Sequence, residues 1–333
     1  MIIQTGQRTD IPAFYSSWLL NRLKEGFVMV RNPFYPSSVS RYQLNPKVVD
    51  LITFCTKNPL PVLKNPELMK ELSAYNQWWY VSLTPYGKEI EPHVPEKAQV
   101  AEGIIELGKI LGKEKVGWRY DPIFISEKYS PAYHLKAFEN IAKRLCGYTE
   151  TAVISFIDLY PKVKRNFPEA REVSREERLF LGKAMVEIAG KYGMTLRPCA
   201  EGKELSEFGA DCSGCQTIEV LEKALKNVLK DDKKLKIPGK SPARKSCSCY
   251  LNGDIGAYNS CGHLCKYCYA NSSPQQVLEN MKAHMPSSPL LIGEIKEGDR
   301  IFDPEQKSFI VPLNPAASDR DKNYPGLFDD YLL

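Results

Sequence analysis

Residues 49–83 read VDLITFCTKNPLPVLKNPELMKELSAYNQWWYVSL. The apolar run at 49–55 predicts a strand, the segment at 60–75 has the apolar spacing of a helix, and the aromatic run at 78–83 predicts a second strand. The polar turn LSAYN marks the end of the helix. A strand, a helix and a strand in succession form a βα unit, which places two parallel strands side by side.

The same alternation extends on both sides of this stretch. Further strands are predicted at 2–5, 27–31, 115–119, 152–158 and 194–199, and further helices at 13–25, 95–111, 132–146, 173–192 and 216–230. Repeated units of this kind indicate an α/β fold, and we predict a (β/α) barrel of the TIM type or a partial TIM-type barrel. The stretch PFYPSSVSRYQLNPK at 33–47 is too short and too rich in proline for a full helix, so one unit is irregular.

A doubly wound open sheet is the alternative fold. Such sheets usually present a glycine-rich phosphate turn after the first strand. Here that turn reads TGQRTDIP, with neither a GxGxxG pattern nor a P-loop. The barrel is therefore the favoured prediction.

Composition limits the class of protein. Of the 333 residues, 43% are hydrophobic and 26% are charged, as in soluble globular proteins rather than disordered chains. No apolar run reaches the roughly 18 residues of a spanning helix, and the amino-terminal MIIQTGQRTD does not resemble a signal peptide. We therefore expect a cytoplasmic protein without a membrane partner.

Polar side chains follow the predicted strands at the point where each strand ends. They are Arg8, Asp10, Arg31, Asn32, Lys57, Asn58, Thr84, Arg119, Asp121, Asp158 and Cys199. Any one of them could simply cap a helix or close a turn. Together they would line the mouth of a parallel barrel, where substrates bind. The candidates for holding a charged substrate or cosubstrate are Arg8, Asp10, Lys57, Arg119 and Asp158.

Eight of the ten cysteines lie beyond Pro198, and reduced cytosolic thiols in such clusters usually bind metals. Residues 261–271 read CGHLCKYCYAN, which places Cys261, Cys265 and Cys268 in a C-x3-C-x2-C triplet. Three protein thiolates on a [4Fe–4S] cluster leave one iron open to a substrate or cosubstrate. We expect His263 to face solvent within this loop. The isolated Cys55 and Cys146 are expected in the core.

The triplet resembles the cluster motif C-x3-C-x-aromatic-C of the radical S-adenosylmethionine superfamily, with Tyr267 as the aromatic residue. The resemblance implies that Cys261, Cys265 and Cys268 hold a [4Fe–4S] cluster that binds S-adenosylmethionine. It also implies formation of a 5′-deoxyadenosyl radical that acts on an unknown substrate, with an electron donor such as a flavodoxin or ferredoxin. In that superfamily the cluster loop follows the first barrel strand, whereas here it follows the whole predicted barrel, as in a circular permutation.

A second resemblance covers most of the chain. The opening QRTDIPAFYSSWLLNRLKEGFVMVRNPF, the segments CTKNP and WRYDPI, and DIGAYNSCGHLCKYCYAN are similar to an uncharacterised prokaryotic family defined only as a domain of unknown function. That family carries the same triplet near its carboxyl end. It implies a cofactor but no substrate.

The remaining cysteines suggest another metal site. Cys212 and Cys215 form a C-x2-C pair, and Cys247 and Cys249 form a C-x-C pair. Four thiolates can hold either a second [4Fe–4S] cluster or a zinc ion. Cys199, at a predicted strand end, is the expected substitute for one member of this set.

The chain is expected to have two parts. Residues 1–235 would form the barrel, and 236–333 a cysteine-rich iron–sulfur region packed on it. Between them the basic residues Lys230, Lys233, Lys234, Lys236, Lys240, Arg244 and Lys245 outnumber Asp231 and Asp232. This run is either a solvated linker or a contact for nucleic acid. The alternative function is therefore a non-catalytic nucleic-acid-binding protein stabilised by zinc or by an inert cluster.

Overall fold

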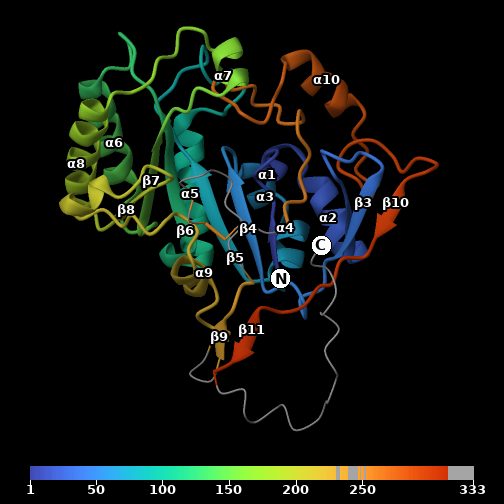
Figure 1. The fold of residues 1–333 in the computed structure, drawn as a ribbon. Helices are drawn as coiled ribbons and strands as arrows, with labels where there is room; N and C mark the ends of the chain where they lie inside the picture. The colour runs from blue at the N-terminus through green and yellow to red at the C-terminus, as the bar shows by residue number, and fades with distance from the viewer. Residues whose placement is uncertain (230–232, 239–246, 248, 251–252, 314–333) are drawn as a thin grey trace, which may run out of the picture.

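A six-stranded parallel sheet forms the centre of the protein (Figure 1). The computed structural model describes residues 1–229, 233–238, 247, 249–250 and 253–313. The strands of the sheet, in spatial order, are β1 (Ile2–Gln4), β4 (Leu51–Thr56), β5 (Gln77–Ser82), β6 (Val116–Ile123), β7 (Thr151–Phe156) and β8 (Thr195–Pro198). Their spatial order follows the chain, and each neighbouring pair is parallel. The predicted α/β fold is confirmed at this level.

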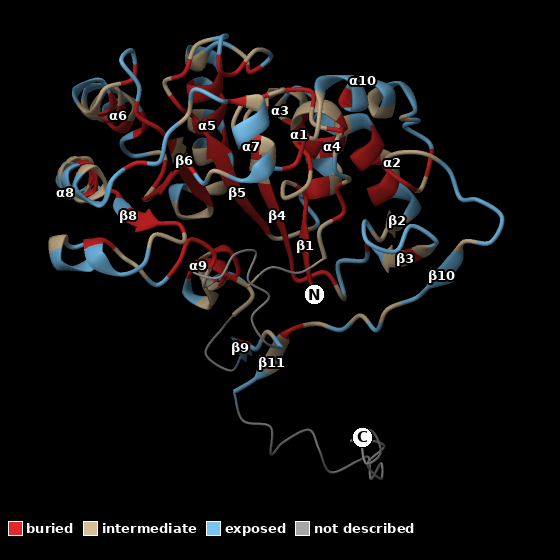
Figure 2. Ribbon diagram, turned by 45° about the horizontal axis from the view of Figure 1, so that its top comes forward, coloured by how far each residue is buried: buried red, intermediate tan, exposed pale blue. Residues whose placement is uncertain are grey.

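The helices connect successive strands. They are α1 (Ile11–Phe14), α2 (Ser16–Glu25), α3 (Leu60–Leu63), α4 (Pro66–Leu72), α5 (Lys97–Leu111), α6 (Pro131–Leu145), α7 (Pro161–Asn166), α8 (Arg175–Lys191), α9 (Ile218–Ala224) and α10 (Pro274–Lys282). Crossovers between adjacent parallel strands have one hand, so helices that join sequential neighbours pack on one face of the sheet. Accordingly α5 packs on α6, and α6 on α8. Their outer faces are exposed, and the strands behind them are buried (Figure 2).

Two strands of the main sheet are buried on both faces, and aromatic rings pack on each face. All residues of β5 and β7 are buried. On the face that carries α6, Trp79 of β5 stacks on Phe54 of β4 with ring centroids 3.9 Å apart, and Trp118 of β6 stacks on Phe138 of α6 at 4.7 Å. On the opposite face, the rings of Trp78 and Tyr80 of β5 meet edge to face at 5.4 Å. Continuous burial of this kind is typical of parallel strands covered on both sides.

The predicted strand at 27–31 lies outside the main sheet. It forms β2 (Phe27–Arg31), which turns back antiparallel on β3 (Ser38–Gln43), and β3 pairs with β10 (Arg300–Phe302). The proline-rich stretch expected to be irregular therefore contains β3. Arg31 binds Asp299 at 2.6 Å in this side sheet and does not line the main sheet's carboxyl edge. A further small sheet joins β9 (Lys233–Leu235) and β11 (Ile310–Pro312).

The main sheet is open. In the part of the chain that the structure describes, no strand joins β8 to β1, so no closed TIM-type barrel forms. Residues 253–255 instead run along the free edge of β1, where the amide of Gln4 donates to the carbonyl of Gly253 at 3.1 Å and the amide of Ile255 to the carbonyl of Gln4 at 3.0 Å. The segment beyond β8 thus returns to the first strand.

No helix among the described residues is both long and apolar enough to cross a membrane.

Candidate functional site

The cysteine loop at 261–271 is bound to residues that follow the parallel strands. His263 Nε2 lies 2.9 Å from Asp10 Oδ2, and the hydroxyl of Tyr267 donates to Glu91. Asp10 follows β1 and Glu91 follows β5. The loop therefore lies at the carboxyl ends of these strands, where open α/β sheets bind their ligands. The helix α10, which comes directly after the loop, lies with α7 at the end of the molecule opposite β9 and β11 (Figure 1).

Asp10 organises one side of this arrangement. Its carboxylate accepts hydrogen bonds from Thr56 Oγ1 and from the amide of Lys57, both at 2.7 Å, and caps α1 through the amide of Ala13 at 3.0 Å. The imidazole of His263 is the fourth group that contacts this carboxylate. The expectation that His263 faces solvent is wrong: its side chain is 2% exposed, because the carboxylate draws the imidazole inward.

Glu91 organises the other side, and the sequence did not point to it. Its carboxylate accepts from Thr84 Oγ1 at 2.7 Å, from Lys57 Nζ at 2.9 Å, and from Lys97 and Tyr267. Burial alone would raise the pKa of Glu91, but the two ammonium groups lower it to about 2. Burial likewise opposes the charge of Lys57, yet the carboxylate of Glu91 raises the Lys57 pKa above its ordinary value. A fixed ion pair thus lies beside the cysteine loop.

The three thiols of the triplet are close enough to interact electrostatically. Cys265 is buried, and Cys261 and Cys268 are partly exposed. Loss of hydration raises the pKa of each, and repulsion from Asp10 and from the other two thiols adds to this effect at Cys261. Lys57 counteracts it at Cys265. Within the described residues, no group of three or more His, Cys, Asp or Glu side chains is already arranged to hold a metal ion.

Backbone geometry brings amide donors to these sulfurs. The amide of Ala270 lies 3.4 Å from the sulfur of Cys268, and the amide of His263 donates to Cys261. Leu264, between the first two cysteines, has a left-handed φ of 54°. A non-glycine residue adopts this conformation only where its surroundings fix it. Two amides of the loop therefore point at cysteine sulfurs.

The other predicted strand-end residues have separate roles. Arg8 binds Asp254 at 2.6 Å and so anchors the segment along β1. Arg119 pairs with Asp121 and lies 5.3 Å from the ring centroid of Tyr80. Asp158 is exposed and accepts from the hydroxyl of Tyr160 at 3.2 Å. Of the five candidates, Asp10 and Lys57 contact the cysteine loop or its partner Glu91.

A second group of thiols lies at the carboxyl end of β8. The sulfur of Cys215 is 3.5 Å from that of Cys199 and 3.3 Å from that of Cys249, and the amide of Cys249 lies 3.4 Å from the sulfur of Cys247. Cys212 lies apart, beside Asp211 and Lys203. The structure therefore brings together Cys199, Cys215, Cys247 and Cys249. Cys199, the expected substitute for one member of the set, takes the place of Cys212.

The two isolated cysteines differ. Cys55 is partly buried and packs against the core, as expected. Cys146 is exposed and not in the core, because it follows the last residue of α6 and leaves the helix's buried face.

The predicted nucleic-acid contact lies mostly outside the described residues. Of the lysine-rich run at 230–245, the structure describes 233–238, where Lys233 and Lys234 belong to β9.

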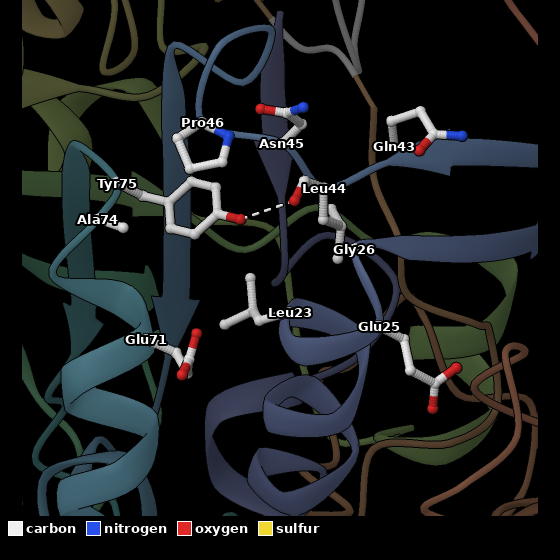
Figure 3. A pocket seen from close by; sticks show the side chains of 10 residues that line it. All are labelled: Leu23, Glu25, Gly26, Gln43, Leu44, Asn45, Pro46, Glu71, Ala74 and Tyr75. Atoms are coloured by element: carbon white, nitrogen blue, oxygen red, sulfur yellow. Dashed lines mark hydrogen bonds between the residues drawn. The ribbon is translucent and has the colours of Figure 1, made fainter.

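A surface groove of about 390 Å³ lies away from both thiol groups (Figure 3). It is lined by the end of α2, by Leu44 and Asn45 before β4, and by Tyr75 before β5, whose hydroxyl donates to the Leu44 carbonyl at 2.7 Å. These residues precede their strands, so the groove lies at the amino ends of the sheet. It contains none of the predicted site residues.

Comparison with known proteins finds a family match. A family model described as a domain of unknown function, DUF1848, covers residues 2–270, which include the strands of the main sheet and all ten cysteines. No curated protein and no solved structure matches the chain.

Proposed function

The chain belongs to the DUF1848 family, and we propose that it is an iron–sulfur enzyme of the radical S-adenosylmethionine type. The observation that carries the proposal is the position of the C-x3-C-x2-C loop. It is held over the carboxyl ends of parallel strands by Asp10 and Glu91. A motif that bound an inert metal would need no such contact with the functional edge of the sheet.

The residues fit a cluster with three protein ligands, Cys261, Cys265 and Cys268. Soft thiolates are the ligands that iron–sulfur clusters take, and hydrogen bonds to sulfur stabilise the thiolate form. The amides at Cys261 and Cys268 supply such bonds, and the ammonium of Lys57 near Cys265 offsets negative charge. A reduced cluster of this type would donate an electron to the sulfonium of S-adenosylmethionine, releasing methionine and a 5′-deoxyadenosyl radical.

The sheet also supports this assignment. Six parallel strands in sequential order with helices packed in chain order suit a partial TIM-type barrel. We propose that the cysteine loop closes this partial barrel from the carboxyl-terminal side, in a permuted order relative to the radical S-adenosylmethionine superfamily. The return of residues 253–255 to β1 brings the chain to the position from which the loop starts.

The charged residues around the loop would bind the cosubstrate or substrate. The methionine part of S-adenosylmethionine carries a carboxylate and an ammonium group, which pair with basic and acidic side chains respectively. Asp10 contacts His263 of the cysteine loop, and Lys57 interacts with Cys265, whereas Arg119 interacts with Cys199 and Cys215 of the other thiol group. We further propose a cytoplasmic protein that receives electrons from a flavodoxin or ferredoxin.

Anaerobic reconstitution tests the proposal. The protein is supplied with iron and sulfide, reduced with dithionite and incubated with S-adenosylmethionine, and 5′-deoxyadenosine is measured by chromatography. We expect a brown protein that forms 5′-deoxyadenosine, a C261A/C265A/C268A variant that forms none, and a C146A control that behaves like the wild type, since Cys146 is exposed and precedes β7, at the amino ends of the strands.

Two outcomes would overturn the proposal. A full cluster that yields no 5′-deoxyadenosine would exclude the radical reaction. A colourless protein with zinc and no iron would favour the alternative of a non-catalytic, metal-stabilised protein that binds nucleic acid.

A further inference from the structure

We propose that Cys199, Cys215, Cys247 and Cys249 bind a single zinc ion in tetrahedral geometry. The site is separate from the triplet at 261–268 and does not depend on the function proposed above. Its role would be structural: it would hold together the two segments that cross the open sheet between β8 and β1.

The sulfur positions point to one ion. Four sulfurs bound about 2.3 Å from one zinc lie about 3.8 Å from each other. The sulfur of Cys215 lies 3.5 Å from that of Cys199 and 3.3 Å from that of Cys249, so these two pairs need to spread by only about 0.3–0.5 Å. The sulfur of Cys247 lies 3.4 Å from the amide of Cys249, and it would move in to complete the set when the ion binds. The cysteines of a [4Fe–4S] cluster bind separate irons at different corners, which requires sulfurs much farther apart. Both distances are also far longer than the roughly 2.05 Å of a disulfide.

Local backbone geometry turns two of the sulfurs toward each other. Ala200, directly after Cys199, has a left-handed φ of 63°, and Gly214, directly before Cys215, has a φ of 126°. Arg197 of β8 donates to the carbonyl of Gly214 at 3.3 Å, and the hydroxyl of Tyr80 donates to the carbonyl of Cys215. The strand end and the loop before α9 are therefore fixed around the thiols by contacts with the sheet.

The surroundings suit the charge of the site. Four thiolates on Zn²⁺ carry a net charge of about −2, which is costly to bury without a cation nearby. Arg119 of β6 interacts electrostatically with both Cys199 and Cys215. Its guanidinium would offset part of that charge.

The position of the site explains what it would stabilise. The amide of Tyr250 donates to the carbonyl of Gln216 at 3.0 Å, and the side chain of Gln216 donates to the carbonyl of Tyr250 at 3.2 Å. The side chain of Gln4 on β1 reaches the same Tyr250 carbonyl at 3.5 Å. Residues 215–216 and 249–250 thus bridge the free edges β8 and β1, where a closed barrel would have further strands. Zinc binding would contribute folding energy at this gap.

Metal analysis of the C261A/C265A/C268A variant tests the proposal without interference from the first site. We expect about one zinc per chain by mass spectrometry, and X-ray absorption that shows four sulfur ligands about 2.3 Å from zinc. Replacing zinc by cobalt should give the absorption spectrum of a tetrahedral tetrathiolate.

Single substitutions in the same background test the ligand set. C215A should lose the zinc, whereas the matched control C212A should keep it, because Cys212 lies beside Lys203 and not with the other thiols. Because C215A could misfold, the protein with all second-site cysteines is also treated with a mercurial reagent, which should release zinc and lower the melting temperature.

Four results would overturn the proposal. They are iron and sulfide retained in the triplet variant, no metal bound at all, a Cys215–Cys249 disulfide in freshly purified protein, and a C212A variant that loses the zinc. Zinc binding in a protein that forms no 5′-deoxyadenosine would support this site while the proposed radical function failed.

Discussion

Glu91 accepts hydrogen bonds from Thr84, Lys57, Lys97 and Tyr267, although only 1% of its side chain is exposed. A buried carboxylate is tolerated only where its charge is paired and its oxygens are satisfied. The same oxygens hold the cysteine loop through Tyr267 and orient Lys57 toward Cys265. One residue therefore couples the ion pair to the placement of the triplet.

The pH dependence of stability should reveal this charge. The pKa of Glu91 in the folded protein is about 2, below the 4.5 of a free glutamate. The stabilisation is thus fully present above about pH 4.5 and is lost as the pH falls toward 2. Glu91→Gln should lower the free energy of unfolding at pH 7 by roughly 3 kcal/mol. The variant should also lack the share of the fall in stability between about pH 4.5 and pH 2 that protonation of Glu91 causes in the wild type.

Urea unfolding from pH 7 to pH 2.5 measures this effect. Glu177→Gln is the control, because Glu177 also has a pKa of about 2 but lies at the surface in the capping box of α8, where solvent screens its charge. Equal losses of stability in the two variants would contradict the central role of Glu91.

Gly6 allows the turn after β1 to approach β4. A Cβ atom at Gly6 would lie 2.6 Å from the Cβ of Cys55 and even closer to its carbonyl oxygen. Gly6→Ala should therefore displace the turn that carries Arg8 and Asp10 and lower the free energy of unfolding by about 1–3 kcal/mol. It should also reduce the iron bound after reconstitution, because Asp10 holds the cysteine loop through His263.

Thermal unfolding and iron analysis check this prediction. The control is Gly190→Ala, because Gly190 lies in α8, a Cβ atom there would meet no atom within 4 Å, and alanine stabilises a helix by roughly 0.5–1 kcal/mol relative to glycine. If Gly6→Ala leaves stability and iron content unchanged, the close approach is not required.

At the scale of single elements, His134 joins α6 to β6 and the segment that follows it. Its Nε2 lies 2.9 Å from the carbonyl oxygen of Phe124 and its Nδ1 2.8 Å from the hydroxyl of Tyr120. A carbonyl only accepts, so Nε2 carries the proton and Nδ1 accepts from the hydroxyl. Both bonds are satisfied by the neutral imidazole. Burial accordingly lowers the pKa of His134 to about 4.

Acid should therefore loosen the contact between α6 and the sheet before the carboxylates titrate. The unfolded chain binds a proton at His134 near pH 6.5 and the folded protein only near pH 4, so stability falls as the pH drops between these values. We expect a loss of about 2 kcal/mol between pH 7.5 and pH 5. The variant His134→Gln should be less stable at pH 7.5 but lack this loss, whereas His284→Gln should retain it. The free energy of unfolding is measured by urea titration at each pH. If it falls by the same amount between pH 7.5 and pH 5 in the wild type and in His134→Gln, the assignment is refuted.

Local patterns predicted the elements of the main sheet because short-range periodicity determines them. The stretch 49–83 predicted β4 and β5 to within two residues at each end. The strand at 27–31 is also predicted, but its place in a separate sheet depends on its pairing with β3 and on the pairing of β3 with β10. The strand β10 lies near the other end of the chain from β3. Pairing over such a distance leaves no trace in a local pattern.

The candidate site was predictable only where its residues follow a motif. The spacing of Cys261, Cys265 and Cys268 identified the triplet, and strand ends identified Asp10 and Lys57. Glu91 lies in a loop well beyond β5 and belongs to no pattern. Spacing also could not separate Cys212 from Cys215, because the turn at Gly214 directs only the second thiol toward Cys199.

At the scale of the whole molecule, the segment beyond residue 235 is joined to the earlier part at several places. The strand β10 pairs with β3, β11 pairs with β9, and Asp254 forms a bridge with Gln4 of β1. The amino group of Met1 also donates to the carbonyl of Lys307 at 2.7 Å. These contacts argue that the two predicted parts depend on each other for stability.

Limited trypsin digestion tests both the predicted boundary and this dependence. The run at 230–245 offers the densest group of lysine and arginine residues at the predicted junction, so it should be cut first. The two fragments should separate on a denaturing gel but elute together from a sizing column, because the pairing of β10 with β3 and the contacts with β1 and Met1 lie outside the run that is cut. Lysines in folded helices, such as Lys183 in α8, should be cut much later. Simultaneous cleavage in α8 would argue against a boundary at this run, and fragments that elute separately would show that the strand pairings do not hold the two parts together.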